Sequence, residues 1–151
     1  MSKKGKISAP CLVVKFGGKS LADAPRIVRA AEAVAKEKAK GTKIAVVVSA
    51  MGGTTDSLLE TATEACKNAL SGEELDDILS MGERTSARIF TAALKAQGIR
   101  CLYLDPADPK WPIITDAAFT NAQPMTLICE KMTREHVSPM LEQGIVAVIP
   151  G

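Results

Sequence analysis

The chain has 151 residues, of which 46% are hydrophobic and 24% charged. These values indicate one folded domain with a sizeable core and exclude a disordered tail. The formal net charge is only +2 and the basic and acidic residues are interspersed, so we expect no nucleic-acid partner.

The N-terminal segment, MSKKGKISAP, is basic but lacks the apolar stretch of a signal peptide. No apolar run in the chain approaches the ~20 residues of a membrane span. We therefore expect a flexible N-terminus over residues 1–10, no membrane partner and a cytoplasmic protein.

Metal-ligating residue types are few and scattered. The chain has four cysteines, Cys11, Cys66, Cys101 and Cys129. Because no Cys-x-x-Cys pair occurs, we interpret them as free thiols that act as small core residues. The one histidine, His136, is expected on a helix surface, and no metal site built from protein side chains is predicted.

Apolar segments that end at turns predict four strands, over residues 11–16, 43–49, 99–105 and 145–151. We expect the first of them to be a buried strand. Helical spacing of apolar residues predicts four helices, from Pro25 to before Gly41, over 54–70, from a capping box at 71–74 to before Gly98, and from Pro124 to about Gln143. A proline-punctuated loop and a short extended piece over 113–115 lie between the last two.

Strands that alternate with helices predict an α/β protein with a mainly parallel sheet and helices on its faces, in three α/β/α layers. Ligands of such sheets bind at the carboxyl ends of the strands. The chain ends directly after a strand, so we expect it to be the first part of a larger domain.

The first candidate site, VVKFGGKS, follows the first strand and ends like a nucleotide-binding P-loop. P-loop spacing would place the first glycine at Val13, inside the strand, so a P-loop is rejected. Lys15 is costly inside an apolar strand unless it points into a ligand crevice. Gly17 and Gly18 let backbone N–H groups approach an anion, and Ser20 adds a hydroxyl. This stretch is suited to a transferring phosphoryl group, and the alternative is a solvent-facing lysine before a plain turn.

The second candidate, VSAMGGTTD, places the hydroxyls of Ser49, Thr54 and Thr55 and free N–H groups at the start of a helix. This arrangement suits an anion. The alternative is ordinary N-capping of the helix by Thr54 or Thr55.

The third candidate, SMGERTSAR, interrupts the apolar period of the long helix. Gly82 costs about 1 kcal/mol relative to Ala in a helix interior, so its presence indicates that another group approaches closely. Glu83 beside it is suited to bind a substrate ammonium group. The alternative is a solvated helix face that carries Glu83, Arg84 and Arg88.

In this order, the motifs VKFGGKS, VVVSAMGGTTD and LSMGERTSARIF resemble those of the aspartate kinases in the amino-acid kinase superfamily. The segment ITDAAFTNAQP, residues 114–124, looks like that family's Thr-Asp segment. The resemblance covers residues 12–151. It implies the amino-acid kinase (carbamate kinase-like) fold, with residues 11–151 as its amino-terminal portion, on the amino-acid-substrate side. The family's nucleotide-binding portion, its Gly-Arg-Gly-Gly-Ser-Asp loop and its ACT regulatory domains would lie past Gly151.

The resemblance implies ATP-dependent phosphorylation of the L-aspartate β-carboxylate to 4-phospho-L-aspartate, the first step toward lysine, threonine and methionine. Lys15 matches the catalytic lysine that stabilises the transferring phosphate, and Gly17 and Gly18 match the glycines near it. Mg²⁺ would be held by the nucleotide phosphates and by residues outside this chain. Lys19 departs from the family, which has Thr or Ser at this position.

The resemblance also assigns substrate-binding residues. Ser49 and Thr55 match the turn that helps to hold the amino-acid substrate, and Glu83 matches the glutamate that binds its amino group. As an isolated chain, residues 1–151 are expected to be weak or inactive as a kinase. We expect a homo-oligomer or association with the missing half.

Two alternatives to the aspartate kinase interpretation remain. One is a non-catalytic or complementing module that binds amino acids. The other is a different amino-acid kinase, such as a glutamate-type enzyme, against which the SMGE helix and the SAMGGTTD turn argue.

Overall fold

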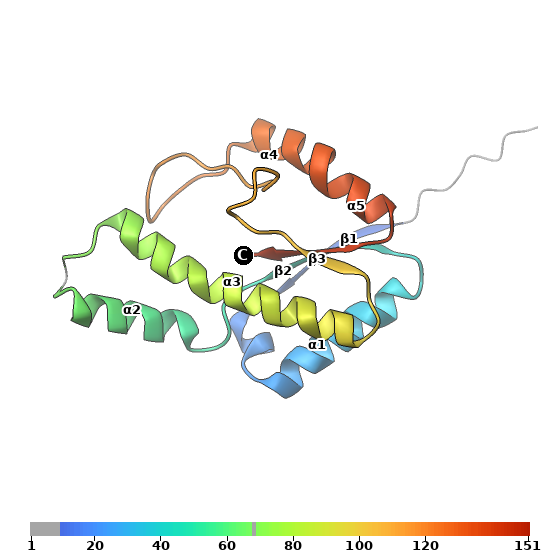
Figure 1. The fold of residues 1–151 in the computed structure, drawn as a ribbon, viewed down its shortest axis with the longest axis horizontal. Helices are drawn as coiled ribbons and strands as arrows, with labels where there is room; N and C mark the ends of the chain where they lie inside the picture. The colour runs from blue at the N-terminus through green and yellow to red at the C-terminus, as the bar shows by residue number, and fades with distance from the viewer. Residues whose placement is uncertain (1–9, 68) are drawn as a thin grey trace, which may run out of the picture.

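The computed structural model describes residues 10–67 and 69–151. Within them, β1 (Cys11–Phe16), β2 (Lys43–Val48), β3 (Cys101–Tyr103) and β4 (Val146–Pro150) form one sheet in the order β1-β2-β4-β3 (Figure 1). All three strand pairs are parallel, as expected. The expectation for residues 1–10 lies, except for Pro10, outside the described residues.

The helices follow the turns between the strands. They are the short 3₁₀ turn η1 (Gly18–Leu21), α1 (Ala24–Lys38), α2 (Thr54–Ala65), α3 (Gly72–Ala96), α4 (Thr126–Met132), the π turn η2 (Thr133–Val137) and α5 (Ser138–Glu142). Asp23 caps α1, and Ser71 and Glu74 form the expected capping box of α3. In the described part of the chain, no helix is both long and apolar enough to cross a membrane.

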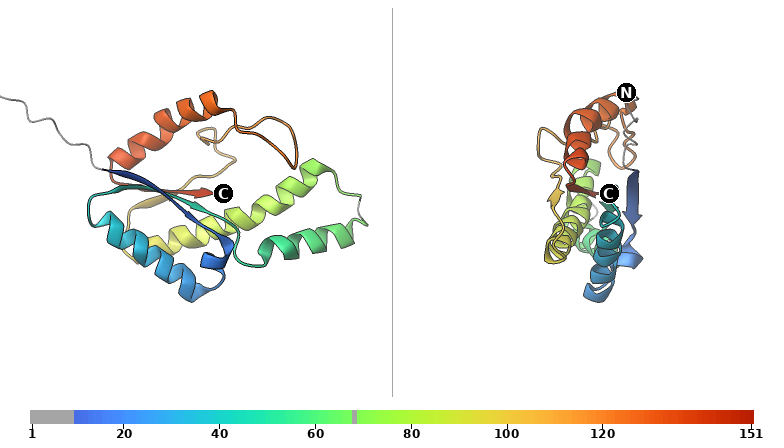
Figure 2. Two further views of the ribbon diagram at one scale, coloured as in Figure 1. Left: turned by 180° about the vertical axis from the view of Figure 1, so that it is seen from behind. Right: turned by 90° about the vertical axis from the view of Figure 1, so that its right-hand side faces the viewer.

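The two faces of the sheet are covered by different helices. On one face, α1 and α3 pack over alternate strand residues such as Val46 and Val148, with Phe90 fully buried between the layers. On the other face, α5 and η2 place Val137 and Leu141 against Ala45 and Ala147. Figure 2 shows these layers from two further sides. The expected three-layer α/β/α arrangement is confirmed.

The expectation that residues 11–16 are a buried strand is wrong. β1 pairs only with β2 among the described strands, so it forms an edge of the sheet. Val13 is 67% exposed and Leu12 40% exposed. The expected core role of the cysteines is also wrong for Cys11, on this edge strand, and for Cys66, which follows the last turn of α2, since both are exposed free thiols.

The last predicted helix, from Pro124 to about Gln143, contains a π turn. Pro139 has no backbone N–H, so it cannot bond to the carbonyl four residues earlier, and Ser138 bonds instead to the carbonyl of Thr133. His136 lies in this π turn and is half-buried rather than on the helix surface, because it faces the space beside β3. α2 is shorter than expected and ends at Ala65.

Candidate active site

The carboxyl ends of three strands lie at the same level. Phe16 pairs with Val48, and Val48 pairs with Pro150. The ladder continues beyond the strands, since the N–H of Ser49 donates to Phe16 O (3.0 Å) and the N–H of Gly151 donates to Val48 O (2.9 Å). The turns that follow β1 and β2 therefore lie side by side, next to the end of β4.

The turns after β1 and β2 are in direct contact. A Cβ atom at Gly18 would lie 2.9 Å from the carbonyl oxygen of Ala50, so this packing requires glycine. Likewise, a Cβ atom at Gly52 would lie 3.1 Å from the Cβ of Ala22. Gly17 differs, because a Cβ atom there would meet nothing within 4 Å. Gly18 is thus required by packing, whereas Gly17 faces open space that a ligand can enter.

The long helix α3 reaches the same turn through Gly82 and Glu83. A Cβ atom at Gly82 would lie 2.9 Å from the Cβ of Ala50. Glu83 Oε1 accepts a hydrogen bond from the N–H of Ala50 at 3.3 Å. Ala50 is only 4% exposed because Gly18 and α3 enclose it. All three motifs singled out in the sequence meet at this residue.

The predicted site residues differ in exposure. Glu83 and Ser49 are half-buried, whereas Lys15, Ser20 and Thr55 are exposed. The helix that starts at Thr54 is capped by Gly53, which has a φ of +79° and no side-chain cap bond. Ordinary N-capping by Thr54 or Thr55 is therefore wrong, and the Thr55 hydroxyl is not used as a cap.

Lys15 lies on the less covered face of the sheet. Its neighbours Val14 and Phe16 pack into the core under α1 and α3. Side chains alternate along a strand, so Lys15 lies on the same face as Val13 and, by register, as Val47. This face also lines a cavity, although Lys15 itself is not part of the cavity wall.

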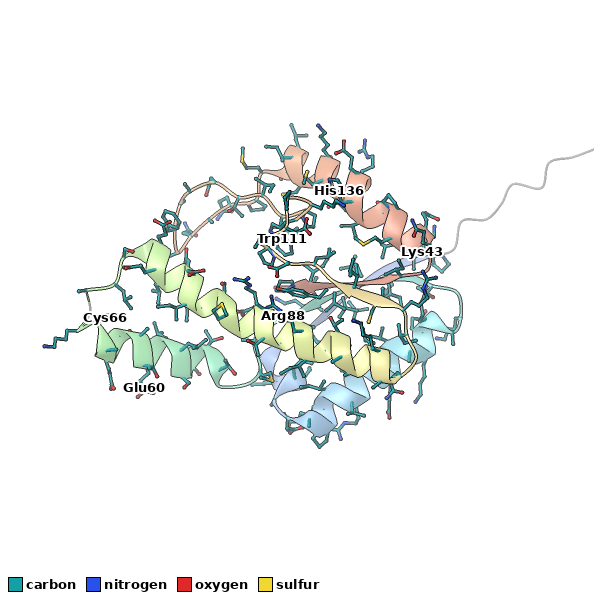
Figure 3. The ribbon with its side chains drawn as sticks, in the orientation of Figure 1. Lys43, Glu60, Cys66, Arg88, Trp111 and His136 are labelled. Carbon is teal, nitrogen blue, oxygen red and sulfur yellow. The ribbon has the colours of Figure 1, made fainter. Side chains whose placement is uncertain are left out.

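A cavity of about 690 Å³ lies on this face of the sheet. Its wall is mostly apolar and includes Val13, Val47, Ile149, Leu141 and the segment 111–113. Glu83, Arg84, Ser80 and Thr115 are among its polar lining residues. Trp111 lies between the sheet and the helix that carries His136 (Figure 3). The volume is in the range of small-molecule sites, and Glu83 supplies it with a carboxylate.

Arg84 and Arg88 both pair with Asp105, directly after β3, and Arg84 is the less exposed of the two arginines. Arg84 Nη2 lies 3.2 Å from Asp105 Oδ1, and Arg88 Nη2 lies 2.9 Å from Asp105 Oδ2. The Arg88 guanidinium also lies 4.5 Å from the centre of the Tyr103 ring. The pKa of Arg84 is raised, first by the adjacent Tyr103 side chain and then, against the effect of burial, by Asp105.

The Tyr103 hydroxyl and Arg84 Nε have no hydrogen bond of good geometry to a described residue. The ion pair with Asp105 is therefore the contact of the Arg84 guanidinium that has good geometry. The sequence did not indicate this cluster, since only two charges one turn apart on α3 and an Asp after a strand were visible.

The chemistry of these groups favours an anion over a metal ion. Lys15, the open backbone at Gly17 and the Ser20 hydroxyl are donors suited to phosphate. In residues 10–67 and 69–151, no three His, Cys, Asp or Glu side chains gather where they could hold a metal ion.

A parallel sheet with helices on both faces and glycine turns at its strand ends is typical of an α/β domain that binds a ligand at this edge. The chain belongs to the amino acid kinase family, whose model matches residues 10–151. The fold expected from the motifs is confirmed.

Among curated proteins, the aspartokinase of Mycobacterium tuberculosis is 36% identical over 140 residues, which cover 93% of this chain and 31% of that protein. The aspartokinase of Helicobacter pylori is 32% identical over 140 residues, again 93% of this chain and 33% of that protein. The chain thus spans about a third of the length of the curated relatives that it matches.

Solved structures of two aspartate kinases and a carbamate kinase superpose on this chain. The aspartate kinase from Synechocystis superposes with a TM-score of 0.72 at 28% identity, covering 95% of this chain and 22% of that one. The E. coli aspartokinase III, in complex with aspartate and ADP, gives 0.77 at 20% identity, covering 93% of this chain and 40% of that one. The carbamate kinase from Giardia lamblia gives 0.61 at 13% identity, covering 95% of this chain and 57% of that one, and shares the fold.

Proposed function

We propose that the polypeptide to which these residues belong phosphorylates the β-carboxylate of L-aspartate with ATP, giving 4-phospho-L-aspartate and ADP. The observation that carries the proposal is the contact of Glu83 with Ala50, which joins α3 to the turns at the ends of β1 and β2. Relatives at 32–36% identity are aspartokinases, which supports this substrate.

Lys15 and the turn after it are proposed to bind the phosphates of ATP. A carboxylate oxygen of aspartate attacks the γ-phosphorus while the bond from that phosphorus to the ADP oxygen breaks. This transfer needs positioned positive charge rather than covalent help from the protein. The Lys15 ammonium supplies the charge, and the Gly17 backbone and the Ser20 hydroxyl add hydrogen-bond donors.

Glu83 is proposed to bind the substrate ammonium. One of its carboxylate oxygens is held by Ala50, and the other accepts no hydrogen bond from a described residue. A half-buried carboxylate with a free oxygen in a cavity is a strong acceptor for a primary ammonium group. The hydroxyls of Ser49 and Thr55, on the neighbouring turn, are proposed to hold the rest of the amino acid.

The proposal assigns the remaining parts of the reaction to residues outside this chain. These include the ligands of Mg²⁺ beyond the nucleotide phosphates and the groups that bind adenine. We therefore expect the isolated 151-residue chain to show little or no kinase activity, and the natural polypeptide to act as a homo-oligomer or as a complex with the remainder of the kinase domain.

The test uses the natural polypeptide with ATP, Mg²⁺ and L-aspartate, and hydroxylamine to trap the acyl phosphate. We expect aspartyl hydroxamate from the wild type and strongly reduced formation from the Glu83→Gln variant, with L-glutamate as a poor substrate. Equal turnover of aspartate by wild type and variant, or a preference for glutamate, would contradict the proposal.

A second candidate is a complementing module, favoured by two observations. The chain spans about a third of its relatives, and β1 exposes Val13 and pairs with only one of the described strands. Mixing the chain with a polypeptide that supplies the remaining kinase segments tests this. Activity regained only on mixing supports a complementing module, and no association by sedimentation contradicts it.

A further inference from the structure

We propose that Asp105 is a positioning residue for Glu83. It holds the guanidinium of Arg84 away from the Glu83 carboxylate and so leaves that carboxylate free for the substrate ammonium. This inference rests on the proposed function of Glu83 and extends it to a residue that none of the three motifs contains.

The contacts of Asp105 define a clamp between the loop after β3 and helix α3. Asp105 Oδ1 bonds to Arg84 Nη2 at 3.2 Å and to the N–H of Ala107 at 3.1 Å. Its Oδ2 bonds to Arg88 Nη2 at 2.9 Å. The bond to Ala107 holds the Asp105 carboxylate on the loop after β3. The position of this loop, and not helix α3, therefore sets where the Arg84 guanidinium is bound.

Arg84 and Glu83 are neighbours that line the same cavity. The Arg84 side chain is only 23% exposed, so a freed guanidinium would lose much of its access to water. An unpaired cation in an apolar wall is strongly driven to find a carboxylate. Adjacent side chains on a helix diverge, so pairing with Glu83 requires Arg84 to fold back into the cavity. Asp105 prevents this movement by binding the guanidinium on the loop after β3.

One other carboxylate acts on Arg84. Asp77 lies close enough to help raise the pKa of Arg84. If Arg84 turned toward Asp77 when Asp105 is removed, Glu83 would remain free and substrate binding would not change. The affinity for the amino acid therefore distinguishes a freed Arg84 that pairs with Glu83 from one that pairs with Asp77.

Steady-state kinetics on the natural polypeptide test the inference. For Asp105→Ala we expect the KM for L-aspartate to rise about tenfold or more, as for loss of a charged hydrogen bond, with kcat within about threefold of wild type. Adding Arg84→Gln to Asp105→Ala removes the competing cation, so we expect the KM of the double variant to return to within about threefold of wild type. A clamp that only stabilised the fold would leave the double variant as impaired as Asp105→Ala.

Arg88→Gln is the matched control. Like Arg84→Gln it removes one positive charge, and it breaks the other ion pair of Asp105, one turn farther from Glu83. We expect its KM for aspartate to stay within about threefold of wild type. A rise equal to that of Asp105→Ala, or a failed rescue in the double variant, would overturn the inference. If Asp105→Ala does not fold, Asp105→Asn, which keeps an acceptor for Ala107, replaces it.

A second readout needs no activity. The Ala50 amide reports its bond to Glu83 and is observed by selective ¹⁵N-alanine labelling. We expect its resonance to move in Asp105→Ala and to return in the double variant, while Arg88→Gln leaves it in place. If the wild type does not phosphorylate aspartate, the proposed function fails, and this signal alone decides the role of Asp105. An Ala50 resonance that is unchanged in Asp105→Ala would overturn it.

Discussion

Gly82 and Ala50 touch across the interface between α3 and the turn after β2. A Cβ atom added at position 82 would lie 2.9 Å from the Cβ of Ala50 and 3.5 Å from Cγ2 of Thr54. Glycine therefore sets the distance at which α3 passes the strand ends. The next residue, Glu83, reaches the Ala50 amide because of this close approach.

The first prediction concerns Gly82→Ala. Alanine is the better helix former by about 1 kcal/mol, but its methyl group must displace Ala50, and overpacking costs about 1–3 kcal/mol. We expect no gain or a net loss in the free energy of unfolding, together with a higher KM for aspartate. Denaturant unfolding and steady-state kinetics measure the two effects.

Thr85→Ala is the control for this change, since Thr85 is exposed on the same helix. It should leave both the unfolding free energy and KM close to wild type. A Gly82→Ala variant that is more stable than wild type with unchanged KM would show that the contact does not constrain the site.

The second prediction separates the two neighbouring glycines. Gly18→Ala brings a Cβ atom 2.9 Å from the Ala50 carbonyl oxygen, and backbone must move to accept it. We expect a loss of about 1–3 kcal/mol in the free energy of unfolding. Gly17→Ala has free space around it and an extended φ of −78°, so it should not lower stability. Equal melting temperatures for the two variants would contradict this assignment.

Much of the fold could be predicted because it depends on local pattern. Apolar runs that end at turns predicted every strand, although β3 is shorter than the predicted 99–105, and the Ser71–Glu74 capping box predicted the start of α3. The exposure of β1 could not be predicted, because it depends on which strands and helices lie beside it. The π turn at 133–137 was missed because the periodicity of a helix changes little across one widened turn.

The site was partly predictable for a similar reason. Ligands of parallel sheets bind at the carboxyl ends of the strands, so the turns that follow the strands were predicted as the place of the site. Ala50 is contacted by Gly18, Gly82 and Glu83. These contacts depend on where α3 crosses the strand ends, and the spacing of residues in the sequence does not predict that position. The pairing of Asp105 with Arg84 joins residues 21 positions apart through tertiary packing. The sequence showed only an Asp directly after a strand and two arginines one turn apart on a helix, which does not predict that they pair.

The third prediction concerns the two lysines of the first motif. Lys15 lies in β1 opposite Val47, at the end of the strand, whereas Lys19 lies in the turn η1, and both are exposed. Removal of a group that stabilises transition-state charge costs about 10²–10³ in kcat. We expect a loss of this size for Lys15→Met and a kcat within about threefold of wild type for Lys19→Met.

Each lysine variant loses one positive charge, so overall charge is matched between them. The hydroxamate assay on the natural polypeptide measures both. If Lys15→Met kept its activity while Lys19→Met lost it, the phosphate would be held by the turn rather than by the strand end. The assignment of Lys15 would then be wrong.

The fourth prediction uses the pH dependence of the capping box at the start of α3. Glu74 Oε2 accepts hydrogen bonds from the N–H (2.9 Å) and hydroxyl (2.8 Å) of Ser71. These bonds lower the pKa of Glu74 from its ordinary value of 4.5. A carboxyl group whose pKa is lower in the folded state contributes stability above its unfolded pKa, and this contribution is lost as the pH falls through the folded pKa.

We therefore expect Glu74→Gln to lower the melting temperature at about pH 7, and the difference from wild type to shrink at about pH 3, where Glu74 is protonated in more of the folded molecules. Glu73→Gln is the control, because Glu73 lies in the same first turn but outside the capping box. Thermal unfolding followed by circular dichroism measures all three proteins at both pH values. The same difference at both pH values would mean that the contribution of Glu74 does not depend on its charge, which would contradict the prediction.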